Sequence, residues 1–331
     1  MMRIQRNPTH KRAFTLVELL VVMAVLVLLS SLVLSALAGA AEQARENRTR
    51  SQIQKIHELL MSRYEDYRYR RVPPLKVKTT DPTNPRADVR ARQRDRVDKI
   101  RELIRMEMPS CREDLQFGPQ VPASIPAADR VSPSLWNRYR RTVVRRTNSA
   151  DFDTAISTEN WTNQHQESEC LYMILESIQD GDTNGLDFFR ESEIGDIDGD
   201  GMPEILDGWG QPIIWIRWAP GHLGAQTDLH DQGSPDPFDP LGVRGGRNQD
   251  PPNSGIYTNY PLYPLIVSRG PDQDLHMVFR ASPINAGTIN NPYAANGDGV
   301  FVGTFATGDA TLPTAHYDNI TNHQLIIGGN D

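Results

Sequence analysis

Cysteine, aromatic residues and long apolar runs are all scarce in this chain of 331 residues. Two cysteines are too few for a disulfide-rich scaffold. Only one segment is apolar enough to cross a bilayer, which excludes a protein with several membrane spans. Hydrophobic residues make up 38% and aromatic residues 7% of the chain. Because that one segment holds much of the apolar content, the remainder is more polar than these averages indicate.

Recognisable catalytic motifs are also missing. The eight histidines are dispersed without the spacing of metal ligands, and the sequence contains no Gly-x-Ser-x-Gly turn, phosphate-binding loop or evident catalytic dyad. Because nothing positive points to catalysis, we expect a protein that is not an enzyme.

Acidic residues are missing from residues 1–13, and basic residues are rare after residue 150. Residues 1–150 contain 29 Lys and Arg against 15 Asp and Glu, a net charge of +14. Residues 151–331 contain 6 against 27, a net charge of −21. Halves of such opposite charge favour two physical units in one chain.

Proline is absent between Pro8 and Pro73, which allows a long uninterrupted helix. Leu19–Ala41 is a run of 23 residues without charge, about 34 Å as a helix and enough to cross a hydrocarbon core of roughly 30 Å. Further apolar residues then recur at steps of three and four, the spacing of a helical stripe: Ile53, Ile56, Leu59, Leu60, Tyr64 and Tyr67. We predict one helix from about residue 14 to about residue 71, roughly 85 Å long.

The basic start followed by an apolar run fits three interpretations. It is typical of a secretory signal peptide, here with an Ala-x-Ala site that ends at Ala38, of a single-span anchor, or of a prepilin signal. Glu18 separates them, because a carboxylate in an apolar stretch must be paired or kept at an interface. A plain signal peptide or anchor has no need of such a residue.

The segment Lys11–Leu20, with the sequence KRAFTLVELL, closely resembles the prepilin-type cleavage and methylation segment of type IV pilins and type II secretion pseudopilins. The resemblance implies that prepilin peptidase cuts between Ala13 and Phe14, where the family usually has Gly before the cut, and then methylates the new terminus. It also implies that Glu18 pairs with the terminal ammonium of a neighbouring copy. The expected location is the bacterial inner membrane, with one span and the head in the periplasm.

Composition divides the chain into four segments: a leader at 1–13, a membrane and stalk helix at 14–72, an Arg-rich, partly helical insertion at 73–150, and an acidic α/β head at 151–331. Within the insertion, seven arginines are mixed with four acids between residues 86 and 105. This composition is typical of a patch that binds nucleic acid or anionic lipid, and also of the solvated face of a helix with internal ion pairs. The balanced charges favour the solvated helix, so nucleic acid is not an expected partner.

In the head, the patterns predict a helix at Glu167–Ile178 and a long surface excursion over Ala219–Pro261. Five short strands are expected: Ile213–Trp218, Leu262–Ser268, Leu275–Phe279, Val300–Phe305 and Gln324–Ile327. We therefore expect an α+β fold, in which a long, pilin-like N-terminal helical stalk carries a loop-rich, mostly antiparallel β head.

A loop in the acidic head has the spacing of an EF-hand calcium loop. Side-chain oxygens occur at positions 1, 3, 5, 9 and 12, with Gly at position 6 and a backbone carbonyl at position 7, which gives the candidate ligands Asp196, Asp198, Asp200, Met202, Glu204 and Asp207. Calcium prefers six to eight oxygen ligands, so we expect a structural Ca²⁺ here. The alternative is an acidic turn without metal. A weaker match runs from Asp180 to Glu191.

Short stretches of the head also resemble the major type II secretion pseudopilin, namely Asp207–Pro212, Ser268–Asp272 and Asp318–Ile320. By that resemblance, Ser268 and Asp272 are further metal candidates. Cys111 and Cys170 either form a disulfide or are two buried thiols.

These observations together predict a structural, pseudopilin-like filament subunit of a type II secretion-like apparatus, assembled from copies of itself and related pseudopilins through the N-terminal helix. The alternatives are a type IV pilin for adhesion or DNA uptake, and a soluble secreted calcium-binding module cut near Ala38.

Overall fold

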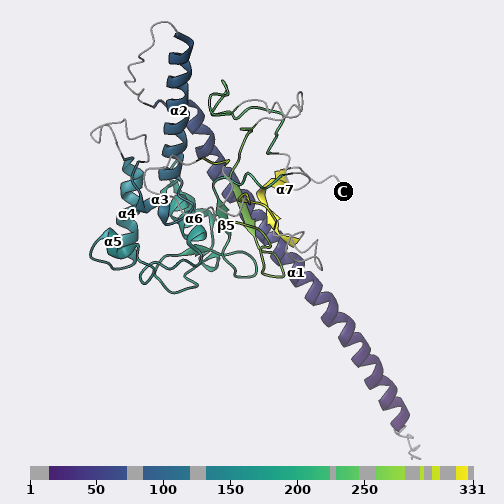
Figure 1. Cartoon of the computed structure of the whole chain (residues 1–331). Helices are drawn as coiled ribbons and strands as arrows, with labels where there is room; N and C mark the ends of the chain where they lie inside the picture. The colour runs from purple at the N-terminus through teal and green to yellow at the C-terminus, as the bar shows by residue number, and fades with distance from the viewer. Residues whose placement is uncertain are drawn as a thin grey trace, which may run out of the picture. The chain divides into compact units, whose positions relative to one another are not determined.

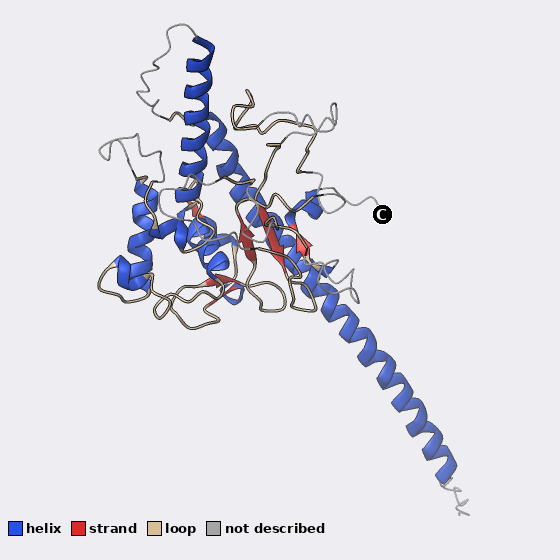
Figure 2. Cartoon of the chain, in the orientation of Figure 1, coloured by secondary structure: helices blue, strands red, loops and turns tan. Residues whose placement is uncertain are grey.

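The computed structural model describes eight segments: 15–72, 85–119, 132–223, 229–245, 258–279, 291–293, 300–305 and 318–326. The chain forms two units, one up to Arg45 and one from Glu46 onward. Helix accounts for most of the regular structure, and the strands are few and short (Figure 2). The fold is α+β, as predicted.

Helix α1 (Leu16–Tyr69) is a single element of 54 residues, which confirms the long N-terminal helix. It ends four residues before Pro73. The part of α1 in the first unit, which lies toward the purple end of the chain in Figure 1, exposes its apolar side chains. Leu20 and Leu26, for example, are 62% and 53% exposed. This part is long and apolar enough to span a membrane.

From Glu46 onward, α1 belongs to the second unit and forms part of its core. Five side chains of the predicted stripe are buried: Ile53, Ile56, Leu60, Tyr64 and Tyr67. The two tyrosines also anchor the helix through hydrogen bonds, since Tyr64 Oη donates to the carbonyl of Leu262 at 2.8 Å and Tyr67 Oη donates to Glu107 at 2.7 Å. The stripe therefore packs within the head.

The Arg-rich insertion contains the predicted helix α2 (Pro85–Glu107), which buries Val97, Ile100 and Ile104. Its charged side chains pair with acids, both nearby and in the acidic half of the chain. Arg101 lies 2.8 Å from Asp236, and Arg105 lies 2.6 Å from Glu102. The ion pairs agree with the predicted pairing within the chain. Arg101 and Arg105 are nevertheless buried, at 6% and 0% exposure, so this part of α2 is not the solvated face that was expected.

Four shorter helices follow α2: α3 (Glu113–Gln116), α4 (Ser134–Arg146), α5 (Phe152–Ala155) and α6 (Gln166–Ser177). Of these, α6 matches the predicted helix within one residue at each end, whereas α4 and α5 were not predicted. Short 3₁₀ turns cover Gly185–Phe188 and Glu191–Glu193.

The largest sheet of the described residues has three antiparallel strands, in the order β5 (Ile214–Ile216), β6 (Leu265–Ser268) and β7 (Ile320–Thr321). Trp215, Ile266 and Ile320 point into the main core, which also contains the α1 stripe and the buried face of α6. Ile214 and Val267 face the other way, into a smaller cluster with Met277 and Val302. Two-residue strands form two further antiparallel pairs: β1 (Gln179–Asp180) with β2 (Thr183–Asn184), and β3 (Ile194–Gly195) with β4 (Glu204–Ile205).

Several predicted strands need correction. The strand expected at Gln324–Ile327 is wrong, because Asn322–Ile326 forms helix α7. The side chain of Asn322 explains the change: it accepts a hydrogen bond from the Ile266 amide at 2.8 Å and donates to the carbonyl of Pro264 at 3.0 Å, so a side chain satisfies groups that a continuing strand would use. The stretches at 275–279 and 300–305 share one bridge, between Met277 and Phe305, and form no strand.

Candidate assembly and cation sites

The first turn of α1 holds Glu18 in a fixed position. Glu18 Oε2 accepts hydrogen bonds from the amide of Thr15 at 3.3 Å and from its hydroxyl at 3.2 Å, while the Glu18 amide donates to Thr15 Oγ1 at 3.2 Å. This is a capping box, which satisfies backbone donors at the helix start. Ala13 and Phe14, the predicted processing residues, lie outside the described residues. Glu18 thus lies in the turn that follows them in sequence.

The candidate calcium loop connects β3 to β4 and wraps around its own carboxylates. Gly199 and Gly201 have φ values of +76° and +89°, a conformation that glycine adopts without strain. Their amides donate to the two oxygens of Asp196 at 2.8 and 3.0 Å. The amide of Met202 donates to Asp200 at 2.9 Å. The backbone therefore fixes both carboxylates before any ligand arrives.

Two overlapping groups of carboxylates lie around this loop. One group comprises Glu169, Asp198 and Asp200, and the other comprises Asp196, Asp198 and Glu204. Within each group, one oxygen from every residue lies within 4.8 Å of the others. Four of the five acids are predicted ligands, and the structure adds Glu169 from α6.

Burial and mutual repulsion act on these acids. Burial, reinforced by the charges of Asp200, Asp198 and Glu204, raises the pKa of Glu169 to about 10. Burial and the neighbouring aspartates raise the pKa of Glu204 to about 8. A hydrogen bond from Trp161 to Glu169 and one from the Ile197 amide to Glu204 favour the ionised forms, but burial and the neighbouring charges outweigh them. In the absence of a cation, the protonated forms are favoured.

Asp207, the predicted ligand at position 12, belongs to neither group. Its carboxylate accepts hydrogen bonds from the amides of Trp209 and Gln211, both at 2.9 Å, and from the hydroxyl of Ser268 at 2.6 Å. These hydrogen bonds place Asp207 at a turn near β6. The side chain of Met202, the predicted ligand at position 7, is fully buried in the main core.

Glu169 and Thr162 were not predicted from the sequence. Glu169 lies on the buried face of α6, far from the loop in sequence. A carboxylate on an otherwise buried helix face is the feature of the sequence that could have identified it. It accepts a hydrogen bond from the indole of Trp161. Thr162 donates through its amide to Asp200 at 2.7 Å and through its hydroxyl to Asp198.

The other predicted metal residues make different contacts. In the Asp180–Glu191 stretch, Asn184 uses its side-chain oxygen to accept from the amide of Leu186 at 2.9 Å, which caps a 3₁₀ turn. Asp272 accepts from the amide of Asp274 at 2.9 Å and lies 3.3 Å from the ring of His276. Metal binding at these positions stays a prediction.

The two cysteines are free thiols in the structure. Burial raises the pKa of both, and each of the two lies among acidic neighbours that raise it further. Cys111 also contributes to the shift at Cys170. Of the two alternatives, the structure contains free thiols, of which Cys170 is buried and Cys111 is half-buried.

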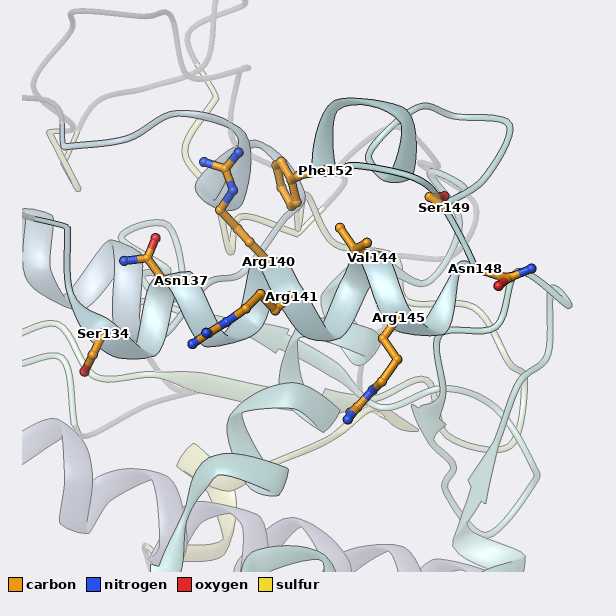
Figure 3. Close-up of a pocket in the computed structure, with 9 residues that line it drawn as sticks. All are labelled: Ser134, Asn137, Arg140, Arg141, Val144, Arg145, Asn148, Ser149 and Phe152. Carbon is orange, nitrogen blue, oxygen red and sulfur yellow. The ribbon is translucent and has the colours of Figure 1, made fainter.

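A hollow lies along α4, as Figure 3 shows. Its described lining includes three arginines, Arg140, Arg141 and Arg145, and no carboxylate, histidine or cysteine. The guanidinium of Arg140 lies 3.9 Å from the ring centre of Phe152 and 4.6 Å from that of Trp136, which is a cation–π arrangement. The hollow therefore presents positive charge, and its described lining offers no carboxylate, imidazole or thiol that could act as a general base beside Ser134 or Ser149.

Comparison with known families gives a match at the N-terminus. The prokaryotic N-terminal methylation motif matches residues 8–34. The chain carries a prepilin-type N-terminus. No curated protein and no solved structure matches the chain.

The prepilin-type N-terminus supports a type IV pilin-like or pseudopilin-like subunit, and this motif belongs to structural subunits rather than to an enzyme family. It implies processing by prepilin peptidase and assembly with pilin-like subunits. The apolar part of α1, which begins inside the matched residues, fits a membrane anchor. The matched range also contains the capping box of Thr15 and Glu18.

Proposed function

We propose that this chain is a structural subunit of a pseudopilus-like filament in a type II secretion-like apparatus, anchored in the inner membrane with its head in the periplasm. One observation carries the proposal: the methylation motif at residues 8–34 runs into a helix whose apolar side chains are exposed within the chain. Such a surface needs lipid before assembly and the same helix of other subunits afterwards.

Glu18 supplies the specific contact in this proposal. Thr15 occupies only its Oε2 in the described contacts, which leaves Oε1 for the terminal ammonium of Phe14 in a neighbouring copy. In a medium of low dielectric constant each charge alone is costly, so the pair fixes the register between subunits.

One contact favours a pseudopilus over a pilus. The stretches Asp207–Pro212 and Ser268–Asp272 resemble the major pseudopilin, and they touch each other through the hydrogen bond from Ser268 to Asp207. Two stretches that resemble the same family, and that lie about sixty residues apart in the sequence, therefore meet at one turn.

The test uses the full chain co-expressed with prepilin peptidase in membranes. Mass spectrometry should find a mature chain that begins with N-methylated Phe14, and a catalytically inactive peptidase should leave the leader in place. A mature chain that begins after Ala38 would contradict the proposal and support the secreted module. Long fibres outside the cell would favour the type IV pilin.

Cross-linking then tests assembly. Glu18→Ala should lower the yield of multimers at least tenfold while membrane insertion persists, because the span becomes more apolar. Glu42→Ala is the matched control, since Glu42 is an exposed acid of the same helix that pairs with Arg45 and should leave multimers unchanged. Equal yields from both variants would show that Glu18 has no pairing role.

A further inference from the structure

Three carboxylate oxygens near the 196–204 loop are buried without a hydrogen-bond partner: Glu169 Oε1, Asp198 Oδ1 and Glu204 Oε1. Glu169 and Glu204 are 0% exposed. An unpaired buried carboxylate is costly, and a partner of opposite charge removes that cost. The contrast with Asp114 is direct, because that fully buried acid lies 2.6 Å from Arg217.

The unpartnered oxygens belong to the two carboxylate groups that share Asp198. The spacing within each group, at most 4.8 Å, fits a cation that holds oxygens at 2.3–2.6 Å, because two ligands on opposite sides of such an ion lie roughly 5 Å apart. Amides of the loop and of Thr162 donate to both oxygens of Asp196 and to both oxygens of Asp200, and each of these oxygens keeps a second lone pair for a cation. The backbone thus holds these two carboxylates in place beside Asp198.

We propose that Glu169, Asp196, Asp198, Asp200 and Glu204 together bind a divalent cation of the size of calcium, centred on Asp198. The ligand set differs from a linear EF-hand loop in three ways: helix α6 contributes Glu169, and neither the carbonyl of Met202 nor Asp207 takes part. The proposal is independent of the filament function, since it rests only on contacts within the head.

The donor chemistry selects the ion. Both groups consist of carboxylates alone, with no imidazole or thiolate, which are the ligands that zinc and copper prefer. Magnesium keeps most of its water and is usually bound by one or two carboxylates. Five carboxylates around a preformed loop therefore suit calcium. The bound ion would tie α6 to the turn between β3 and β4.

The experiment measures Ca²⁺ binding to the full chain in detergent micelles after treatment with chelator. Isothermal titration should detect binding, and Glu169→Gln should weaken the Ca²⁺ affinity at least tenfold. Glu176→Gln is the matched control, because Glu176 lies on the same helix and pairs with Arg146 at 2.9 Å, away from the loop. Equal affinities for wild type and Glu169→Gln, or no Ca²⁺ binding by the wild type, would overturn the proposal.

Asp207→Asn separates the proposed set from the linear loop. Its Ca²⁺ affinity should equal that of the wild type, and a loss confined to this variant would support the linear loop instead. Asp198→Asn provides a second, less buried variant in case Glu169→Gln fails to fold, and it should abolish binding because both groups share Asp198.

A spectroscopic measurement locates the ion. Trp161 donates its indole N–H to Glu169, so Tb³⁺ in the site should luminesce on excitation of tryptophan, and Ca²⁺ should quench that emission by competition. Asp198→Asn should abolish the emission. Emission that persists in this variant would place the ion elsewhere and contradict the proposal.

Discussion

Up to Arg45 the chain exposes apolar side chains, whereas from Glu46 onward it buries charged ones. Leu16 is 79% exposed in the first unit, while Arg105 and Asp114 are 0% exposed in the second. Both regions contain part of the same helix, α1, and neither part contains proline. Helical structure alone therefore says little about surroundings.

The two units differ in which polar groups they keep away from water and in how those groups are paired. In the first unit, backbone groups bond within the helix and the side chains suit lipid. In the second, arginines and carboxylates are paired inside the core, as in the contact of Arg217 with Asp114. Substitutions in the two units should consequently be detected by different measurements.

The largest effect is expected where the head buries a charge. Asp114→Ala leaves Arg217 without its carboxylate and weakens the surroundings of Arg105, so it should cost about 3–5 kcal/mol of unfolding free energy. Urea unfolding of the full chain in micelles measures this loss. Glu46→Ala, which breaks only the exposed pair with Arg50, should cost at most about 0.5 kcal/mol. Equal losses would contradict the assigned difference in burial.

Matched substitutions in the two parts of α1 should have unequal effects on head stability. Ile56→Ala removes a fully buried side chain and should destabilise the head by about 2–5 kcal/mol. Leu26→Ala removes a side chain that is 53% exposed and should leave head unfolding unchanged. Thermal unfolding followed by near-ultraviolet circular dichroism tests the pair. A comparable loss from Leu26→Ala would show that the head uses the first unit.

The smallest effect is a pH dependence confined to the head. Burial lowers the pKa of His230 and, with the charges of neighbouring histidines, that of His323. The unfolded chain, with histidine pKa near 6.5, then binds protons that the folded chain does not bind. The contribution of these two histidines to stability is therefore complete above about pH 6.5 and falls below it, by up to about 1.4 kcal/mol per pH unit for each histidine. Glu169 and Glu204, whose pKa values are raised by burial, contribute in the opposite direction over the same range.

Melting temperatures of the wild type and of the double variant His230→Gln, His323→Gln between pH 7.5 and pH 5.5 test this dependence, because the variant keeps the opposing contribution of Glu169 and Glu204. Residues 15–45 contain no histidine, so retention of the chain in membranes should stay constant over the same range. The same pH dependence in the wild type and in the double variant would mean that these rings are protonated without cost.

Sequence predicted best where one physical signal dominates. The three- and four-residue spacing of Ile53, Ile56 and Leu60 identified the buried face of α1, and Glu18 indicated the N-terminal motif that the comparison confirms. Strands β5 and β6 followed from short β-branched runs, although both are shorter than predicted.

Long-range contacts account for what sequence did not predict. Asn322 bonds with Ile266 and Pro264, which converts an expected strand into α7. Glu169 approaches the 196–204 loop only because α6 packs beside β4, and Asp207 bonds with Ser268 instead of facing that loop. No local pattern encodes such pairings between distant residues.

The boundary between the units has a consequence for modularity. The buried side chains from Ile53 to Tyr67 belong to the head, so the polypeptide that folds as the head begins inside a helix and well before the Pro73-Pro74 break. A chimera joined near Arg45 would transplant the head with its own core residues of α1. A chimera joined at Pro73 would leave the carbonyl of Leu262 and the carboxylate of Glu107 without the hydrogen bonds from Tyr64 and Tyr67. Exchange of heads among such subunits, by recombination or by design, therefore has to carry along the second part of α1.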